Sequence, residues 1–476
     1  MSLLKKHTIA LSVCVLTLLL LAKFFWPLFV YTVPLGYDVG LYRYLFIRHA
    51  TGFPPFIISP MDTWALGHPL GLFIFTSILM KVGLPVSWLI GWIWNLFPVL
   101  LALVIAWVTA KREGKAVGVL VLLAAILSVA YFDAFAYMYW KTLASLLWCV
   151  LSFHLLEKKS PFAVLTGILT VVTHHQTGLL FGLVFLSWTA IQFFTVPASQ
   201  KKSKNTKMMV MMGSVILALG LVFYIPVWNL AVWPHILELL QGRSAPGGNF
   251  PSLLFYLRTE GILLAFGVVG FAYTLKKKSF SLSLWHLSVV WSAVFVLLRL
   301  LFYKRFFLHL DFFLLPFAAI AIKELWLRYK VPSMRIFLVC ALFFQSLVTL
   351  AAVSMRTPSI DDSTYEALSH LSESIPTGAT VLGLENETTP FLLGFLPDTK
   401  AGGPGFELSW SYDDWKQFIL GTHTDRARLL GTLTKPVFVY APPAFKRYYG
   451  TYADFFLQDA CFTETQTPYL FAADCK

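Results

Sequence analysis

The chain has 476 residues, of which 58% are hydrophobic, 16% aromatic and only 13% charged. Soluble domains carry about 25% charged residues, so this composition excludes a soluble enzyme as well as a disordered or collagen-like chain. The net charge of +13 is unevenly distributed, because residues 1–355 hold 28 basic and 9 acidic residues whereas residues 356–476 hold 9 and 15. We therefore expect a multispanning membrane domain over residues 1–355 and an acidic, water-soluble domain over residues 356–476.

Apolar stretches between residues 9 and 354 are long enough to cross the roughly 30 Å hydrocarbon core of a bilayer as helices. The eleven predicted spans are 9–33, 86–110, 116–132, 139–156, 161–176, 178–197, 208–230, 252–275, 283–302, 306–324 and 333–354. The first stretch is too long for an ordinary signal peptide and lacks a cleavage site of small residues. We expect it to be a retained anchor.

The apolar stretch 68–84 decides the orientation of every later span. It is short and interrupted by glycine and proline, so we expect it to lie in the outer interface without crossing the membrane. If it does not cross, the later basic loops all face the cytoplasm, the side that short basic loops prefer. These loops are 111–115, 157–159, 201–207, 276–278 and 323–330. The amino terminus is therefore expected in the cytoplasm and the acidic domain outside the plasma (or cytoplasmic) membrane. Anionic membrane lipids explain these basic clusters better than nucleic acid, which we do not expect as a partner.

Acidic residues on the outer side indicate a site there, because a carboxylate at this surface adds little to packing and is costly to bury. Asp38 precedes a segment, 39–49, that is typical of an amphipathic interfacial helix. Capping that helix is the alternative role of Asp38. Asp133 follows the third span, either as a solvated loop carboxylate or as a second acid that meets Asp38 across an outer cavity. Lys141 is the expected counter-ion of Asp133.

Five consecutive polar residues, Thr173 to Thr177, interrupt an apolar run where the fifth span should reach the outer side. Adjacent positions on a helix point about 100° apart, so His174 and His175 are not expected to share a zinc ion. Hydrogen bonding to a phosphate or to a sugar hydroxyl fits them better. A hydrogen bond to a neighbouring carbonyl is the structural alternative.

Basic residues predicted on the outer side are exceptions to the preference of short basic loops for the cytoplasm. Lys304 and Arg305 lie between the ninth and tenth spans, where they either reach outer headgroups or hold an anion such as a phosphate. The loop 233–251 contains Arg243 in a stretch rich in glycine and proline. This loop is either a plain linker or a segment that orders over a ligand, with Arg243 as a phosphate contact.

The acidic domain alternates short apolar and polar runs, which predicts a small α/β domain. Helices are expected over 362–374, 412–420 and 425–433, and strands over 381–384 and 437–440. Cys461 and Cys475 lie in this domain, where an oxidising compartment favours a disulfide over two free thiols. No phosphate-binding loop, dinucleotide-binding fingerprint or nucleophile elbow is present, so ATP-driven transport has no support.

The layout resembles the GT-C superfamily of integral-membrane glycosyltransferases. Asp38 matches the acid of the family's first outer loop, His68-Pro-Leu70 is similar to the opening of an interfacial segment in that loop, and Asp133 matches the second outer-loop acid. The run from Tyr303 to Pro316 is similar to a basic and aromatic segment found late in many members. Two features depart from known branches. Asp38 lacks the acidic neighbour of protein mannosyltransferases, and Trp410–Trp415 lacks the adjacent tryptophans of the oligosaccharyltransferase signature.

The resemblance implies an all-α polytopic membrane protein with a small C-terminal α/β domain outside the membrane. It implies a glycosyltransferase that moves a sugar from a polyprenyl-phosphate-linked donor to a hydroxyl of a glycan, lipid or protein acceptor. Asp38 would be the general base and Asp133 a second catalytic acid, with Mg or Mn as a possible divalent cofactor on both. The residues expected to bind the lipid phosphate are His174, His175, Arg243, Lys304, Arg305 and Lys141.

Two other classes of function stay open at this point. A secondary transporter needs a path to both faces, and Glu260 with Arg258 in the eighth span is the best indication of one. A non-catalytic scaffold or sensor would use the acidic domain to bind a partner.

Overall fold

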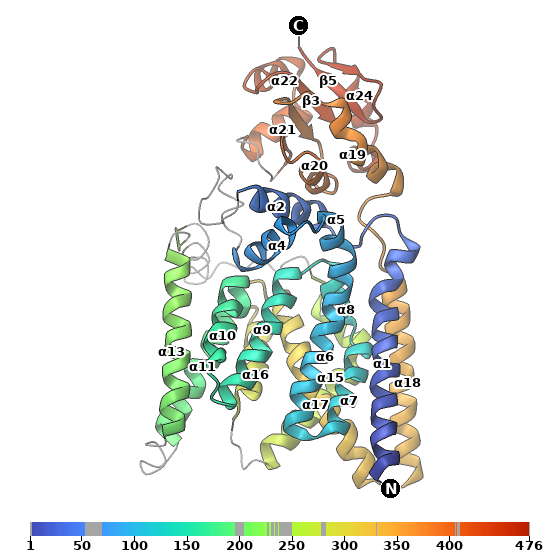
Figure 1. Cartoon of the computed structure of the whole chain (residues 1–476). Coiled ribbons are helices and arrows are strands. Elements are labelled where there is room, and N and C mark those ends of the chain that lie inside the picture. Colours follow the sequence, from blue (N-terminus) through green and yellow to red (C-terminus); the bar gives the residue numbers. More distant parts are fainter. Residues whose placement is uncertain are drawn as a thin grey trace. The chain divides into compact units, whose positions relative to one another are not determined.

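The computed structural model describes residues 2–52, 69–195, 204–225, 228–229, 233, 237, 250–277, 282–329, 331–404, 406 and 410–475. The chain divides into two compact units (Figure 1). The first unit contains Met1–Trp26, Pro69–Leu72 and Trp92–Arg356, and the second contains Pro27–His68, Phe73–Gly91 and Thr357–Lys476.

Long apolar helices build the first unit. They are α1 (Ser2–Val30), which continues into the second unit, α6 (Trp94–Glu113), α7 (Lys115–Leu127), α8 (Val129–Ala136), α9 (Trp140–Glu157), α10 (Phe162–Thr173), α11 (His175–Thr195), α13 (Lys204–Tyr224), α15 (Leu253–Lys277), α16 (Leu284–Leu297), α17 (Tyr303–Arg328) and α18 (Pro332–Ser354). Each of the eleven predicted spans overlaps at least one of these helices. Among the described residues, seven helices are long and apolar enough to cross a membrane, or eight if one bent pair counts as a span.

Two segments differ from simple spans. The third predicted span, 116–132, is not continuous, because α7 and α8 meet at Ser128 with a bend of 59°. The Ser128 hydroxyl accepts a hydrogen bond from the amide of Tyr131 and so begins a new helix. α4 (Gly71–Lys81) has eleven residues and rises only about 16 Å, too little to cross a membrane. This agrees with the interfacial segment expected over 68–84, of which residue 68 lies outside the described part of the chain.

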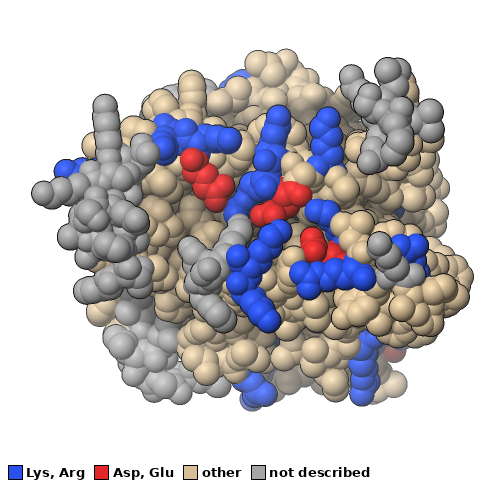
Figure 2. All heavy atoms as spheres, turned by 90° about the horizontal axis from the view of Figure 1, so that it is seen from below, with Lys and Arg blue, Asp and Glu red and all other residues tan. Residues whose placement is uncertain are grey.

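Basic residues gather at one end of the helices. Figure 2 shows many Lys and Arg side chains on the face seen from below, with few acidic side chains among them. Ion pairs at helix ends include Arg112 with Glu157 at 3.3 Å and Arg328 with Glu324 at 3.6 Å. The described basic residues of the loops 111–115 and 157–159 therefore lie together, as the Arg112–Glu157 pair shows, and the cytoplasmic location of the basic loops stays a prediction.

The second unit combines a five-stranded sheet with short helices. The sheet order is β2-β1-β3-β5-β4, with β1 parallel to β2 and β3, and with β5 antiparallel to β3 and β4. Its strands are β1 (Thr380–Gly383), β2 (Lys400–Gly402), β3 (Val437–Tyr440), β4 (Phe462–Glu464) and β5 (Leu470–Ala473). Its helices are α2 (Val39–Thr51), most of α4, α5 (Val86–Trp88), α19 (Asp362–Ser374), α20 (Thr389–Phe395), α21 (Tyr412–Leu420), α22 (His423–Leu430), α23 (Pro443–Tyr449) and α24 (Thr451–Leu457).

The predicted elements of this domain are present in the structure. The helices expected over 362–374 and 412–420 have those bounds, and the third begins at His423 and ends at Leu430. The expected strands correspond to β1 and β3 within one residue at each end. The remaining three strands and the helices α20, α23 and α24 were not predicted, because their apolar runs are only a few residues long.

Helix α2 belongs to the same unit as the sheet because it packs closely on α20. A Cβ atom on Gly40 would lie 2.2 Å from backbone atoms of Phe391 and Pro390, so only glycine permits this approach. The Arg43 Nε donates to the carbonyl of Gly394 at 3.0 Å. The segment that follows Asp38 is therefore held by residues more than 350 positions later in the chain.

Burial of His49 on α2 gives this unit a pH dependence. Its ring stacks on Phe73 with centroids 4.6 Å apart, and burial lowers its pKa from 6.5 to about 4. Between these two values the unfolded chain binds more protons than the folded one, so stability is complete above pH 6.5 and falls as the pH drops. The loss is about 2 kcal/mol at pH 5. We expect the amides of α2 to exchange faster at pH 5 than at pH 7.5, after correction for intrinsic rates, and His49→Phe to abolish the difference. A pH effect unchanged in that variant would contradict the assignment.

Candidate functional site

Asp133 is fully buried on α8, so the expectation of a solvated loop carboxylate is wrong. Arg356 donates to it through Nε at 2.7 Å and through Nη2 at 2.8 Å, and the Tyr256 hydroxyl donates at 2.8 Å. The counter-ion of Asp133 is therefore Arg356, rather than Lys141. A buried carboxylate is held here by a bidentate ion pair and one further hydrogen bond.

These contacts decide whether the surroundings of Asp133 suit a divalent cation. Both carboxylate oxygens already accept hydrogen bonds from Arg356, and the guanidinium fills the position in front of the carboxylate. Mg²⁺ or Mn²⁺ would need several oxygen ligands at that position. The arrangement of Asp133 suits an arginine and does not fit the expected metal site.

The predicted histidine pair lies at the junction of α10 and α11. α10 ends at Thr173, His174 has an extended backbone, and α11 begins at His175. His174 Nδ1 lies 2.9 Å from the Thr177 hydroxyl, which lies 2.9 Å from His309 Nε2. We name His174, His175, Thr177 and His309 the histidine cluster.

The direction of the hydrogen bond between Thr177 and His309 follows from one carbonyl. His309 Nδ1 lies 3.3 Å from the carbonyl oxygen of Arg305, which can only accept, so Nδ1 carries the proton and Nε2 accepts from Thr177. Nδ1 of His174 lies 2.9 Å from the same hydroxyl and accepts from the backbone amide of Thr177 at 3.4 Å. The second nitrogen of His174, Nε2, faces the Thr142 hydroxyl at 3.4 Å. The cluster is a chain of imidazole and hydroxyl groups within hydrogen-bond distance of one another.

Two predicted cations accompany the histidine cluster. Lys141 and Arg305 both interact electrostatically with His174. The Arg305 guanidinium lies 5.2 Å from the centroid of the Tyr139 ring, and its Nε is a buried donor with no partner among the described residues. The structure therefore brings His174, His175, Lys141 and Arg305 to one place, and Lys304 precedes Arg305 on α17.

The segment before α17 has a strained backbone. Arg299, Leu301 and Phe302 all have positive φ, at 52°, 27° and 43°. Such values are costly for residues other than glycine and are common next to functional sites. Leu301 and Phe302 line the groove described next.

An apolar groove of about 300 Å³ begins beside the histidine cluster and runs along α10, α11 and α13. Most of its lining is aliphatic or aromatic, including Leu183, Leu217 and Phe306. Its polar lining includes His175 and Gln176. The Gln176 side chain is buried, and neither of its amide atoms has a hydrogen-bond partner among the described residues. An elongated apolar ligand with a polar end suits this groove.

Asp38 lies in the second unit, directly before α2, and its side chain makes no capping hydrogen bond to the helix. Burial and the carboxylates of Asp38 and Glu385 raise the pKa of the neighbouring Tyr37. The Tyr37 hydroxyl donates to the carbonyl of Asn386, in the loop that follows β1. Asp38 is thereby placed near the carboxyl end of a parallel strand, the edge at which α/β sheets commonly bind ligands. Its pairing with Asp133 stays a prediction.

Arg243, the predicted phosphate contact, and His68, the first residue of the predicted interfacial segment, lie outside the described residues. Several residues at the site were missed at the level of sequence, namely Arg356, Tyr256 and Lys23 in α1. The signal for Lys23 was a lone charge within a predicted span, which is a functional indication by default. No comparable signal marked Arg356, which follows the last span like any basic flanking residue.

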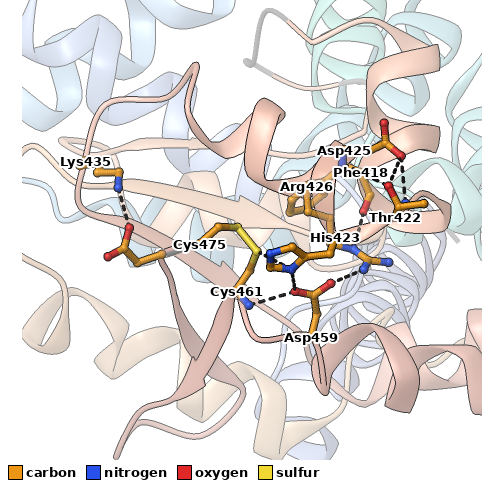
Figure 3. The surroundings of a disulfide bond; sticks show 10 residues. Phe418, Thr422, His423, Asp425, Arg426, Lys435, Asp459, Cys461 and Cys475 are labelled. Carbon is orange, nitrogen blue, oxygen red and sulfur yellow. Dashed lines mark hydrogen bonds and ion pairs between the residues drawn. A yellow bond between two sulfur atoms is a disulfide. The ribbon is translucent and has the colours of Figure 1, made fainter.

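A disulfide joins Cys461 to Cys475 in the second unit (Figure 3). His423 and Asp459 lie beside it, and these two with Cys461 come close enough to suggest metal ligands. The Cys461 sulfur is bonded to Cys475 and offers no thiolate, and Asp459 already accepts from Arg426 at 2.5 Å and pairs with His423 at 2.7 Å. The contacts of His423, Asp459 and Cys461 with one another and with Arg426 and Cys475 explain their closeness without a metal ion.

Comparison with known proteins identifies the fold. Solved structures of the Archaeoglobus fulgidus oligosaccharyltransferase match the chain in the apo form with a TM-score of 0.64 and 12% identity, covering 92% of this chain and 70% of that one. The complex with zinc and sulfate gives 0.61 and 15%, covering 97% and 73%. The form tethered to an acceptor peptide containing the NVT sequon gives 0.58 and 13%, covering 100% and 75%. No model of a known protein family matches the sequence, and no curated protein matches it. The resemblance drawn from the sequence is confirmed at the level of fold: this is a multispanning chain with the GT-C fold of an oligosaccharyltransferase.

Proposed function

We propose that this protein is a membrane glycosyltransferase that transfers a sugar from a polyprenyl-phosphate-linked donor to an acceptor hydroxyl. The transfer takes place at the extracytoplasmic face of the plasma (or cytoplasmic) membrane. The fold supports the general class, and the residues of the site support the kind of donor. The acceptor is a glycan, a lipid or a protein, and the peptide bound by the archaeal neighbour makes a protein one natural candidate.

The observation that carries this proposal is the groove beside the histidine cluster. A polyprenyl phosphate has a long apolar chain and an anionic head, and the groove offers an apolar length with the polar side chains of His175 and Gln176 in its lining. Arg305 directly precedes the lining residue Phe306 on α17. Gln176 supplies an amide at the groove and Arg305 supplies a buried Nε–H, and neither group has a hydrogen-bond partner in the described part of the chain. A buried polar group without a partner costs about 1–3 kcal/mol, which a bound phosphate would recover.

The proposed reaction is a displacement at the anomeric carbon of the donor sugar. The Asp38 carboxylate takes the proton of the acceptor hydroxyl as its oxygen bonds to that carbon. The bond from the carbon to the phosphate oxygen breaks, and the lipid phosphate leaves with the electron pair. Arg305, Lys304 and Lys141 stabilise the negative charge that develops, an effect that a low dielectric strengthens.

Asp133 keeps a supporting role in this proposal. Its charge is balanced by Arg356, so no step passes through a metal at this position. A divalent cation stays a prediction for Asp38, the other expected ligand, and the comparison of transfer with added Mg²⁺ or Mn²⁺ and with EDTA measures it.

Donor binding is tested with Gln176→Leu. Native mass spectrometry of the purified protein should first reveal a bound lipid phosphate, and transfer assays with polyprenyl-phosphate sugars then identify the donor. We expect Gln176→Leu to raise the KM for that donor at least 10-fold, about 1.4 kcal/mol, because the amide contact is lost. Gln192→Leu, on the same helix but outside the residues that line the groove, is the matched control and should leave KM unchanged.

Other outcomes favour the other classes of function. Isotope uptake into proteoliposomes without any transfer would favour a secondary transporter. Neither transfer nor uptake, with no bound lipid phosphate, would favour a scaffold or sensor.

A further inference from the structure

The break between α7 and α8 exposes backbone groups that a membrane does not satisfy. At Ser128 the last carbonyls of α7 and the first amides of α8 lose their partners within the helices. Each such group left unpaired in hydrocarbon costs several kcal/mol. The Thr349 hydroxyl of α18 donates to the carbonyl of Leu127 at 2.6 Å, so a neighbouring helix satisfies part of this need.

Lys23 pairs with the free carbonyl groups at the end of α7. Its ammonium donates to the carbonyl oxygens of Ala125 at 3.2 Å, Ile126 at 2.8 Å and Ser128 at 2.6 Å. All three donors of the ammonium are used. A cation at the carboxyl end of a helix also interacts favourably with the helix dipole. Lys23, a charge within the apolar part of α1, therefore caps a different helix.

Glu260 pairs with a free amide at the start of α8. Its Oε1 accepts from the amide of Ala130 at 2.5 Å and lies 3.1 Å from the Ser128 hydroxyl. The Ser128 hydroxyl lies 2.7 Å from Oδ2 of Asp311 and accepts from the amide of Tyr131. The side chain thus pairs with one of the free amides at the start of α8.

The contacts around Ser128 require a shared proton. A hydroxyl has one proton to donate, yet Ser128 lies within hydrogen-bond distance of both Glu260 and Asp311. One of the two carboxyls therefore supplies the other proton. With that proton the group formed by Lys23, Glu260 and Asp311 has no net charge, as a buried site in a membrane demands.

We propose that Lys23, Glu260 and Asp311 are positioning residues that fix the break at Ser128 and, through it, the place of Asp133. Asp133 lies on α8, five positions after Ser128, and Arg356 and Tyr256 hold its carboxylate. As far as Asp133 serves the transfer reaction, this inference rests on the function proposed above. The effect on α8 itself does not depend on that function.

Hydrogen–deuterium exchange of the full-length protein over residues 129–137 tests the positioning. We expect Glu260→Leu, which removes the acceptor of the Ala130 amide, to speed exchange there at least 10-fold. Glu260→Gln keeps an acceptor oxygen for the Ala130 amide, and should stay within 2-fold of the parent protein. Thr259→Val, on the same helix, is the control and should leave exchange unchanged, because its hydroxyl bonds within α15.

A second variant keeps the test decisive if Glu260→Leu does not fold. Lys23→Met should speed exchange over the same segment, and Lys23→Met combined with Asp311→Asn should reverse part of that change by restoring neutrality. Unaltered exchange in Lys23→Met would overturn the inference, as would equal effects of Leu and Gln at position 260.

Transfer kinetics separate this inference from the proposed function. With a donor in hand, Glu260→Leu should lower kcat at least 10-fold with little change in KM, and Glu260→Gln should recover most of it. A parent protein without transfer activity would contradict the proposed function, while the exchange data would still decide the positioning of α8.

Discussion

Asp38→Asn is expected to lower the rate of sugar transfer by two or more orders of magnitude, on the order of 3 kcal/mol in activation free energy. The amide has the size of the carboxylate but accepts no proton, so a general base is lost and the shape of the side chain is kept. Folding should be unaffected, because the Asp38 side chain makes no capping hydrogen bond to α2 and the helix is held by its packing on α20. The measurement is kcat with the identified donor and acceptor, together with donor binding, which should persist.

The matched control for this prediction is Asp398→Asn. Asp398 is an exposed acid of the same unit, and the same chemical change there should leave transfer at the parent rate. Turnover near that of the parent in Asp38→Asn would remove Asp38 from the role of base. Loss of donor binding in the same variant would instead indicate a binding role.

Hydrophobic patterning predicted most of the helices because burial in lipid depends on composition alone. It failed at Ser128, where the sequence 116–132 is apolar and contains neither proline nor a charge that would indicate a break. The break exists because Lys23 and Glu260 supply partners for the exposed backbone groups. Those partners come from other helices, 105 and 130 residues away in the sequence, and local patterns carry no record of them.

The candidate site was predictable where polar residues interrupt apolar runs. The histidine pair and Arg305 stood out for that reason, and the structure places them together with Lys141. The environment of Asp133 was not predictable, since its partner Arg356 lies 223 residues later and resembles any basic residue that follows a span. The groove beside Gln176 was equally hidden, because it is formed by helices that are each unremarkable in sequence.

Arg356→Met is expected to be among the most destabilising single changes in the first unit, by about 3 kcal/mol. The substitution leaves Asp133 fully buried with no cationic partner for its carboxylate. Uptake of a proton by Asp133 limits the cost but does not restore the two lost hydrogen bonds. The measurement is the midpoint of thermal unfolding of the purified protein in detergent, followed by the fluorescence of its tryptophans.

The double variant Asp133→Asn with Arg356→Met distinguishes a lost ion pair from lost packing. It removes both charges, so we expect it to recover more than half of the stability that Arg356→Met loses. Arg328→Met is the control for removal of an arginine, because its ion pair with Glu324 is exposed and should contribute less than 1 kcal/mol. If Arg356→Met shifts the midpoint no more than Arg328→Met does, the ion pair with Arg356 does not stabilise the buried carboxylate of Asp133. A role for Arg356 in binding the donor phosphate would then be the next to test.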